Sequence, residues 1–262
     1  MEKDVLEKHL RSAIVAARSA GAMVLDRDKR KQFQVEQKHL NDYVTDADKA
    51  SEELIISQLK DQFPTESFFG EEGGRKEEGK GRWVIDPIDG TTNFFRGVPN
   101  YVISIAWEME PHKPVVGVVF NPRQDEMFVA MQGGGAKLNG MPIHVSSISD
   151  PARSLIVCVP PHRHHELADG YFALERSIFN QCSDIRSLGS CALELCYIAA
   201  GRFDGYYELS LGYYDLAAGM IILQEAGGVL ESIGGIADYH CDLLASNGAL
   251  QPWLRTVVPH AR

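Results

Sequence analysis

A short segment in the first half of the chain places several oxygen-bearing side chains next to one another. The segment Asp86-Pro87-Ile88-Asp89-Gly90-Thr91-Thr92-Asn93 follows the apolar run Trp83-Val84-Ile85. We interpret the run as a buried strand that delivers two carboxylates, Asp86 and Asp89, at its end. Carboxylates are the hard oxygen ligands that Mg²⁺ prefers, and the hydroxyls and backbone N–H groups that follow them suit a phosphate. The pattern indicates metal-assisted phosphoryl transfer.

Three further acidic sites lie elsewhere in the chain. Glu71 follows Gly70, Asp42 and Asp48 flank an expected helix start, and Asp215 begins a segment with small residues, which let backbone and ligand approach closely. An isolated pair of aspartates near a turn is most often solvated turn chemistry, and Asp42 alone favours a turn over a ligand. The combination of all these groups in one chain favours a shared cation site.

Composition excludes several classes of function. The chain has 262 residues and a formal net charge of −10, so it has no general attraction for nucleic acid or anionic membranes. We expect no membrane span and no signal peptide, because no apolar run is long enough and the N-terminus is polar. The five cysteines form no C-x-x-C pair, which favours free thiols and a cytoplasmic location.

Two other polar segments invite a functional reading. His162-Arg163-His164-His165 has a spacing that fits no standard metal site, so we interpret it as a solvated loop. The segment from Arg75 to Arg82, rich in Lys, Glu and Gly, is expected to be an exposed loop. Since it lies between Glu71 and Asp86, we also consider a role for it in closing the site.

The elements that position these groups follow from periodicity and caps. Apolar residues near 3.6 spacing predict a helix over 4–26, and the capping-box pattern at Thr45 predicts a second helix there. Strands are predicted at 101–107, 115–120 and 126–131. Consecutive strands without intervening helices favour an antiparallel sheet.

The second half of the sequence alternates between strand and helix patterns. Strands are predicted at 154–159 and 205–209, and helices at 166–181, 191–200 and 215–226. This order favours an α/β half. We therefore expect an N-terminal α+β half over 1–148, with an antiparallel sheet and the metal site, and a C-terminal α/β half over 149–262, joined as one compact unit.

These motifs resemble those of the inositol monophosphatase family, which comprises lithium-sensitive, magnesium-dependent sugar phosphatases. The resemblance looks closest to its bacterial SuhB-type members and covers about residues 10–250. In chain order, the matching motifs are Asp42-x-x-Thr45-x-x-Asp48, Gly70-Glu71-Glu72, Asp86–Asn93, Arg186-Ser187-x-Gly189-Ser190-x-Ala192, Gly201-Arg202-x-Asp204-Gly205-Tyr206-Tyr207-Glu208 and Asp215-x-Ala217-Ala218-Gly219. One departure is Tyr214, where the family usually has Trp, and it affects the expected pocket shape more than the expected reaction.

The resemblance implies a fold and a set of cation ligands. The implied fold is a layered αβαβα sandwich with the site between the halves, and a homodimer is implied as well. The implied Mg²⁺ ligands are Glu71, Asp86, Asp89, Asp215 and the backbone carbonyl of Ile88. Thr91 matches the residue that holds the attacking water together with Glu71, and Asp48 matches an outer carboxylate associated with a third, weaker metal. We group Glu71, Thr91 and Asp48 as catalytic residues.

The resemblance also implies how a phosphorylated polyol would bind. The phosphate would rest on the N–H groups of Gly90, Thr91 and Thr92, and Glu208 would accept hydrogen bonds from ring hydroxyls. Ser187 and Ser190 match a substrate-facing segment, and Lys38 is expected near the mouth of the site.

The implied reaction is hydrolysis of inositol monophosphate to inositol and phosphate, by direct in-line attack of a metal-activated water. Other phosphomonoesters stay open as substrates: histidinol phosphate, fructose 1,6-bisphosphate, NADP and a phosphoadenosine nucleotide. A different role also stays open, because SuhB-type proteins act in transcription antitermination. The partner would then be RNA polymerase or a Nus factor.

Overall fold

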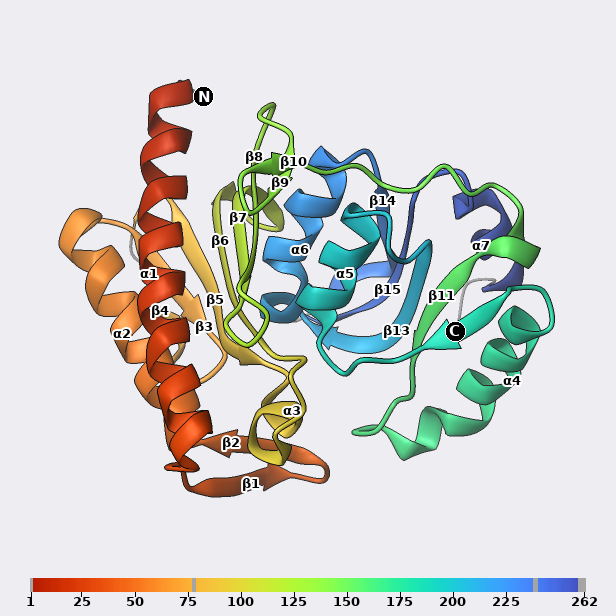
Figure 1. Ribbon diagram of the computed structural model, residues 1–262, viewed down its shortest axis with the longest axis horizontal. Coiled ribbons are helices and arrows are strands. Elements are labelled where there is room, and N and C mark those ends of the chain that lie inside the picture. The colour runs from red at the N-terminus through yellow and green to blue at the C-terminus, as the bar shows by residue number, and fades with distance from the viewer. Residues whose placement is uncertain (1, 77–78, 238–239, 259–262) are drawn as a thin grey trace.

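Helices and two β-sheets alternate as five layers through the molecule (Figure 1). The computed structural model describes residues 2–76, 79–237 and 240–258. Two helices cover the outer face of the first sheet, two lie between the sheets, and two cover the outer face of the second. In that order they are α1 (Lys3–Arg30), α2 (Asp46–Gln62), α5 (Cys191–Ala199), α6 (Tyr213–Glu225), α4 (Ala168–Phe179) and α7 (Gln251–Val257). The expected αβαβα sandwich is confirmed.

The first sheet has eight strands in the order β10-β9-β8-β7-β6-β5-β3-β4. Strands β5 to β8 form an antiparallel meander, as the sequence predicted, whereas β3 runs parallel to β5. Their bounds are β3 (Ser67–Gly70), β4 (Gly74–Lys76), β5 (Arg82–Asp89), β6 (Val102–Glu110), β7 (Lys113–Asn121), β8 (Glu126–Met131), β9 (Ala136–Leu138) and β10 (Met141–Pro142). A separate hairpin of β1 (Val35–His39) and β2 (Asp42–Thr45) lies below α3 (Thr91–Arg96) in Figure 1.

The second sheet has five strands in the order β12-β11-β13-β15-β14. Its parallel part, β12-β11-β13, carries the predicted strand–helix alternation, and β15 and β14 then add in antiparallel fashion. The bounds are β11 (Leu155–Val159), β12 (Asp184–Arg186), β13 (Gly205–Gly212), β14 (Val229–Ala237) and β15 (His240–Ser246). The chain crosses between the sheets over 143–154, which includes the 3₁₀ turn η1 (Pro151–Arg153). A second 3₁₀ turn, η2 (His165–Leu167), precedes α4.

Three apolar clusters hold the layers together. One joins α1 and α2 to the first sheet and includes the buried Trp83 and Trp107. The largest lies around α5 and α6, between the two sheets, and the third lies under α4 and α7. Alanines at 13, 16, 17 and 20 form the buried face of α1, so this long helix approaches the sheet closely. None of the helices in the described part of the chain combines the length and apolar character that a membrane crossing requires.

The start of α2 is set by a capping box. Thr45 is the N-cap residue, its hydroxyl accepts a hydrogen bond from the Ala47 N–H at 3.1 Å, and the Asp48 carboxylate accepts one from the Thr45 N–H at 2.8 Å. The predicted helix start is therefore confirmed. Asp48 is fully buried, and its other carboxylate oxygen contacts Thr91 at the start of α3.

Candidate active site

Asp86 and Asp89 leave the same strand on the same side because β5 is irregular between them. The register against β6 shifts between Asp86 and Asp89, whose partners are Ser104 and Val102. In a regular strand, residues three apart point to opposite faces, and a bulge removes this alternation. The strand thus continues past the predicted end at Asp86, and both carboxylates reach one cavity.

Glu71 reaches the same place from the neighbouring strand. β3 runs parallel to β5, Gly70 is paired with Ile85, and the Glu71 N–H donates to the Ile85 carbonyl at 3.2 Å. Because parallel strands end at one edge of a sheet, Glu71 follows β3 beside Asp86. The buried side chain of Glu52 fixes the turn that follows, since it accepts hydrogen bonds from the Glu72 and Gly73 N–H groups at 3.0 and 2.6 Å.

Asp215 comes from the other half of the molecule, at the third position of α6. Its carboxylate accepts a hydrogen bond from the N–H of Gly212, the N-cap residue, at 2.9 Å. This capping arrangement makes α6 begin at Tyr213 rather than at the predicted Asp215. The same carboxylate that caps the helix therefore lies at the boundary between the two sheets.

Asp86, Asp89 and Asp215 form a group whose ligand oxygens lie within 4.8 Å of one another. Burial and then the neighbouring carboxylate of Glu71 raise the pKa of Asp86 well above its usual value. Burial and then Asp215 raise the pKa of Asp89 to about 7, and the same two causes raise the pKa of Glu71. Buried like charges at this separation are costly without a counter-ion. This donor set therefore fits a hard divalent cation.

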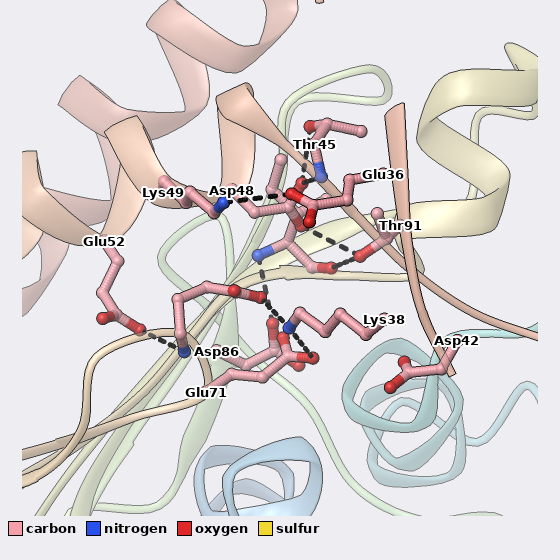
Figure 2. Close-up of polar contacts among 12 residues, drawn as sticks. Glu36, Lys38, Asp42, Thr45, Asp48, Lys49, Glu52, Glu71, Asp86 and Thr91 are labelled. Atoms are coloured by element: carbon pink, nitrogen blue, oxygen red, sulfur yellow. Dashed lines mark hydrogen bonds and ion pairs between the residues drawn. The ribbon is translucent and has the colours of Figure 1, made fainter. Parts of the chain in front are cut away.

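Lys38 on β1 is a positively charged neighbour of the carboxylates. Figure 2 shows its side chain extending toward Glu71, and the Lys38 Nζ lies 3.8 Å from Glu71 and 2.5 Å from Glu72. Although burial opposes the charged form, both glutamates raise the pKa of Lys38. Lys38 was predicted near the mouth of the site; it contacts Glu71 and Glu72 but is not among the residues that line the cavity.

A second chain of hydrogen bonds joins Thr91 to α2. The Thr91 hydroxyl lies 2.9 Å from the Asp48 carboxylate and 3.1 Å from the Ile88 carbonyl (Figure 2). Burial raises the pKa of Asp48 to about 6, against the hydrogen bonds of Thr45. Ser51 on α2 donates to the Pro87 carbonyl at 3.0 Å, so this helix supports the loop that carries Ile88 and Thr91.

Gly90 is required where β5 turns into α3. Its φ is +94°, and an added Cβ would lie 2.9 Å from the Asn100 carbonyl oxygen and 3.1 Å from that of Gly189. Asn93 donates to the Asn100 and Leu188 carbonyls, both at 2.7 Å. The loop before α5 is therefore clamped onto the Gly90 turn, although the two are about a hundred residues apart in the chain.

That clamped loop holds Asp89. The Ser190 hydroxyl and the Ala192 N–H both donate to one carboxylate oxygen of Asp89, each at 2.7 Å. Glu194, which is fully buried, accepts a hydrogen bond from the Leu188 N–H and so fixes the other side of the loop. Ser190 was predicted to face the substrate, and the structure shows its hydroxyl oriented toward Asp89.

Glu208 lies on β13 at the far side of the cavity. Its carboxylate accepts a hydrogen bond from the Tyr206 hydroxyl on the same face of the strand. Burial raises the pKa of Glu208 well above its usual value, against this hydrogen bond. The residue offers an acceptor to hydroxyl groups inside the cavity.

A single cavity of about 480 Å³ collects most of the predicted residues. Three are not among its lining residues: Asp48 lies behind Thr91, Ser187 lies in the exposed loop after β12, and Lys38 lies on β1 beside Glu71 and Glu72. The predicted residues that line the cavity are Glu71, Asp86, Ile88, Asp89, Gly90, Thr91, Thr92, Ser190, Glu208 and Asp215.

Sequence reasoning missed part of the wall. His162, Arg163 and His164 line the cavity, although they were interpreted as a solvated loop, and Asn41 and Tyr43 of the β1–β2 hairpin face them. Their position depends on contacts between segments more than 110 residues apart, for which local spacing carries no signal. The segment proposed to close the site runs through β4, and its residues 77 and 78 lie outside the described residues.

The chain is similar to known proteins in both sequence and fold. Residues 6–259 match the sequence profile described as the inositol monophosphatase family. The chain is 42% identical over 206 residues to the Nus factor SuhB of Pasteurella multocida, with 77% of this chain and 76% of that protein covered. It is 40% identical over 213 residues to inositol monophosphatase 3 of Solanum lycopersicum, with 79% of each covered. The crystal structure of the extragenic suppressor protein SuhB from Bartonella henselae superposes with a TM-score of 0.90 at 33% identity, covering 97% of this chain and all of that one.

Proposed function

The chain belongs to the inositol monophosphatase family, and from this premise we propose that it is a Mg²⁺-dependent phosphomonoesterase that hydrolyses inositol monophosphate to inositol and phosphate. The observation that carries the proposal is the group of Asp86, Asp89 and Asp215, gathered within 4.8 Å from two halves of the fold. Its raised pKa values mark a cluster of negative charge that a divalent cation would relieve.

The proposed cation ligands are the carboxylates of Glu71, Asp86, Asp89 and Asp215 and the carbonyl of Ile88. When bound, Mg²⁺ supplies positive charge that polarises the phosphate and lowers the pKa of water. The N–H groups of Gly90, Thr91 and Thr92 are proposed to receive the phosphate oxygens, because the left-handed Gly90 turn directs consecutive N–H groups into one cavity.

Thr91 and Glu71 are proposed to orient the attacking water. Since the Thr91 hydroxyl can donate to Asp48, its oxygen stays free to accept a hydrogen bond from water. Glu71 lines the same cavity, and burial raises its pKa toward the range useful for a general base. Asp48 then orients the Thr91 hydroxyl, and Ser190 orients the Asp89 carboxylate.

Direct attack by water fits the chemistry of the cavity better than a covalent intermediate. The cysteine that lines the cavity is Cys191, and burial raises the pKa of its thiol well above the usual value. A thiol with so little thiolate is a poor nucleophile near neutral pH. The polyol is proposed to bind between Glu208 and the loop at 162–164.

A panel of phosphomonoesters tests the proposal. Purified protein with Mg²⁺ is expected to turn over inositol 1-phosphate faster than histidinol phosphate, fructose 1,6-bisphosphate, NADP or a phosphoadenosine nucleotide. Excess EDTA is expected to abolish release of phosphate, and lithium is expected to inhibit it. Full activity in EDTA would contradict the cation site, and faster turnover of histidinol phosphate would contradict the substrate.

A second function is favoured by one comparison, since the Pasteurella multocida relative is named a Nus factor. We propose as the alternative that this chain binds RNA polymerase or a Nus factor, with hydrolysis secondary. Arg186 is exposed, and Arg202 is bound to Glu126 at the surface. A cytoplasmic homodimer is proposed under either function.

A further inference from the structure

The loop between β11 and α4 brings a permanent cation to the candidate active site. Figure 1 shows this loop crossing from the second sheet toward the β1–β2 hairpin at the open end of the molecule. His162, Arg163 and His164 all line the cavity, and the Arg163 side chain is 42% exposed. None of these residues belongs to the motifs that define the cation ligands or the phosphate cradle.

The loop is held in place by the tip of the hairpin. The Asn41 side-chain amide donates to the His162 carbonyl at 2.8 Å, and an Arg163 Nη lies 3.0 Å from the Asp42 carboxylate. On the other side, the His164 ring lies 3.2 Å from the Ser210 hydroxyl on β13. Arg163 is therefore fixed at the cavity wall between elements of both halves.

The charge of the loop at neutral pH resides on Arg163. Burial and then the adjacent guanidinium lower the pKa of His162, so that its ring is neutral there. Burial opposes the charge of Arg163 as well, but Asp215, Asp42 and Glu71 together raise its pKa. Arg163 thus faces the carboxylate cluster across the cavity, and divalent cations bound at Asp215 and Glu71 would remove most of that attraction.

A guanidinium in this position has more donors than its partner uses. Arginine presents five N–H donors in a planar fork, and Asp42 is its ion-pair partner among the described residues. The fork matches the oxygens of a carboxylate or a phosphate, whereas a neutral polyol needs acceptors such as Glu208 as well as donors. The cavity wall therefore favours a negative group.

We propose that Arg163 is a specificity-determining residue that binds a second anionic group, a phosphate or a carboxylate, on the alcohol part of the substrate. The inference rests on the proposed function and narrows its substrate class. Among phosphomonoesters that share one alcohol skeleton, the member with a second negative group is turned over more efficiently than the member without it. Asp42 holds the guanidinium at the wall and competes with the incoming anion.

Matched pairs of substrates test the inference. Inositol 1-phosphate and inositol 1,4-bisphosphate differ by a second phosphate, and glycerol 2-phosphate and 2-phosphoglycerate differ by a carboxylate. The wild-type protein is expected to favour the doubly anionic member of at least one pair by about tenfold or more in kcat/KM, the range of a charged hydrogen bond. Arg163→Gln is expected to remove that preference, because kcat/KM for the doubly anionic member falls about tenfold more than kcat/KM for the member with the phosphate ester alone.

The pair whose preference is lost in Arg163→Gln shows whether Arg163 binds a phosphate or a carboxylate. An equal loss of kcat/KM for both members of both pairs would assign Arg163 a structural role and overturn the proposal. A wild-type preference for the members with the phosphate ester alone would overturn it as well. Arg153→Gln, an exposed arginine in η1, is the matched control and is expected to leave every ratio unchanged.

A binding measurement separates this inference from the proposed function. Calorimetry with Mg²⁺ compares phosphonoacetate, which carries two anionic groups, with methylphosphonate, which carries one. The ratio of their affinities is expected to fall about tenfold in Arg163→Gln and to rise in Asp42→Asn, where the competing carboxylate is lost. A ratio that does not change in Arg163→Gln, or that falls in Asp42→Asn, would overturn the role of Arg163. Absence of turnover with every ester would instead contradict the phosphatase.

Discussion

At the scale of single residues, the centre of the molecule is a group of carboxylates that oppose one another. Asp86 and Asp89 share a strand, and Asp215 faces them from α6. A core built only for stability would not place two buried acids and a half-buried one within 4.8 Å. Their mutual repulsion lowers the stability of the cation-free protein and is the free energy that a divalent cation would recover on binding.

Replacing Asp89 by Asn is expected to separate activity from stability. The variant loses one proposed ligand charge, so turnover of inositol 1-phosphate falls by at least about 100-fold. In EDTA it loses a source of repulsion as well, so its Tm is expected to lie at or above that of the wild type. Steady-state kinetics and thermal denaturation measure the two effects. A variant that keeps wild-type activity would show that Asp89 is not a ligand.

The pH dependence of stability follows from the same cluster. In the cation-free folded state the pKa of Asp89 is raised to about 7 and that of Asp48 to about 6, whereas both are near 3.8 in the unfolded chain. The folded state then holds more protons between these values, so its stability falls as pH rises from about 4 to about 7.

Urea denaturation in EDTA at about pH 5 and about pH 7.5 measures this fall, and millimolar Mg²⁺ is expected to reduce it by binding the ionised carboxylates. Because protons compete with the cation, Mg²⁺ affinity is expected to weaken below about pH 7. Equal midpoints at the two pH values in EDTA, for wild type and Asp89→Asn alike, would show that the cluster does not titrate in this range.

The acidic residues proposed as ligands could be singled out from the sequence because each lies in a short motif with turn residues beside it. Arg163 and Glu52 could not, since each contacts a segment that is distant in the chain. Glu194 accepts a hydrogen bond from Leu188, six residues away, but its place in an otherwise apolar helix carries no signal of that contact. A lone arginine or glutamate in a helix or loop is usually a solvated side chain. The motif that contains Ser190 was recognised from the sequence, but the hydrogen bond of its hydroxyl to Asp89, about a hundred residues away, was not.

At the scale of elements, strand ends and helix starts converge on the cavity. The parallel pair β3 and β5 delivers Glu71 and Asp86 side by side, and the bulge in β5 turns Asp89 to the same side. The first turn of α6 supplies Asp215. Asp86, Asp89 and Asp215 are therefore held by regular secondary structure. Glu71 is followed by a turn, and the position of that turn depends on α2.

Glu52 on α2 provides a test of that dependence. Its carboxylate accepts hydrogen bonds from the Glu72 and Gly73 N–H groups, and it fills the space where a Cβ of Gly70 would lie. Glu52→Ala leaves two N–H groups without these partners and opens a small cavity, so a loss of about 1–3 kcal/mol in the free energy of unfolding is expected. Urea denaturation measures it. Glu53→Ala, at the adjacent exposed position, is the control and is expected to change little.

Activity distinguishes support of the site from simple stabilisation of the fold. Glu52→Ala is expected to raise the Mg²⁺ concentration needed for half-maximal activity about 10- to 100-fold, because the turn next to Glu71 loses its hydrogen-bond acceptor. If the variant is destabilised but needs the same Mg²⁺ concentration for half-maximal activity as the wild type, Glu52 has a structural role only.

Elements with strong periodicity were predicted, and those with weak local signals were not. Helix α1 and the meander β6–β8 follow directly from apolar spacing. The strand β1 is polar and mostly exposed, β14 contains two consecutive glycines, and α7 is short, so none of them carries a clear pattern. Their existence depends on packing against β2, β15 and the second sheet.

At the scale of the whole molecule, the outer edge of the second sheet is the surface at which we propose that a second copy binds. β12 is an edge strand that pairs only with β11 among the described strands. Beside it on α4, Phe172 and Phe179 are 51% and 60% exposed. Exposed aromatic side chains next to an open sheet edge are costly in a monomer, and dimerisation would cover them.

Light scattering after size exclusion tests the dimer. The wild-type chain is expected to elute as a species of about 58 kDa, twice its 29.0 kDa mass. Phe179→Glu is expected to shift it toward the monomer, because a charge cannot be buried at such an interface without a partner. Val15→Glu on α1, 57% exposed at the opposite outer layer, is the control. A monomeric wild type would contradict the proposed assembly.

Whether hydrolysis is the main function of the molecule is a question for the cell. Asp89→Asn removes a carboxylate inside the cavity and leaves the outer surface unchanged, so contacts with a large partner are expected to survive. If hydrolysis is the main function, cells carrying this variant behave like cells without the gene. If binding to RNA polymerase or a Nus factor is the main function, the variant restores normal growth, and a pull-down recovers the partner with both proteins. If the Asp89→Asn variant restores growth, the main function is therefore binding of a partner at the outer surface, and hydrolysis in the cavity is secondary.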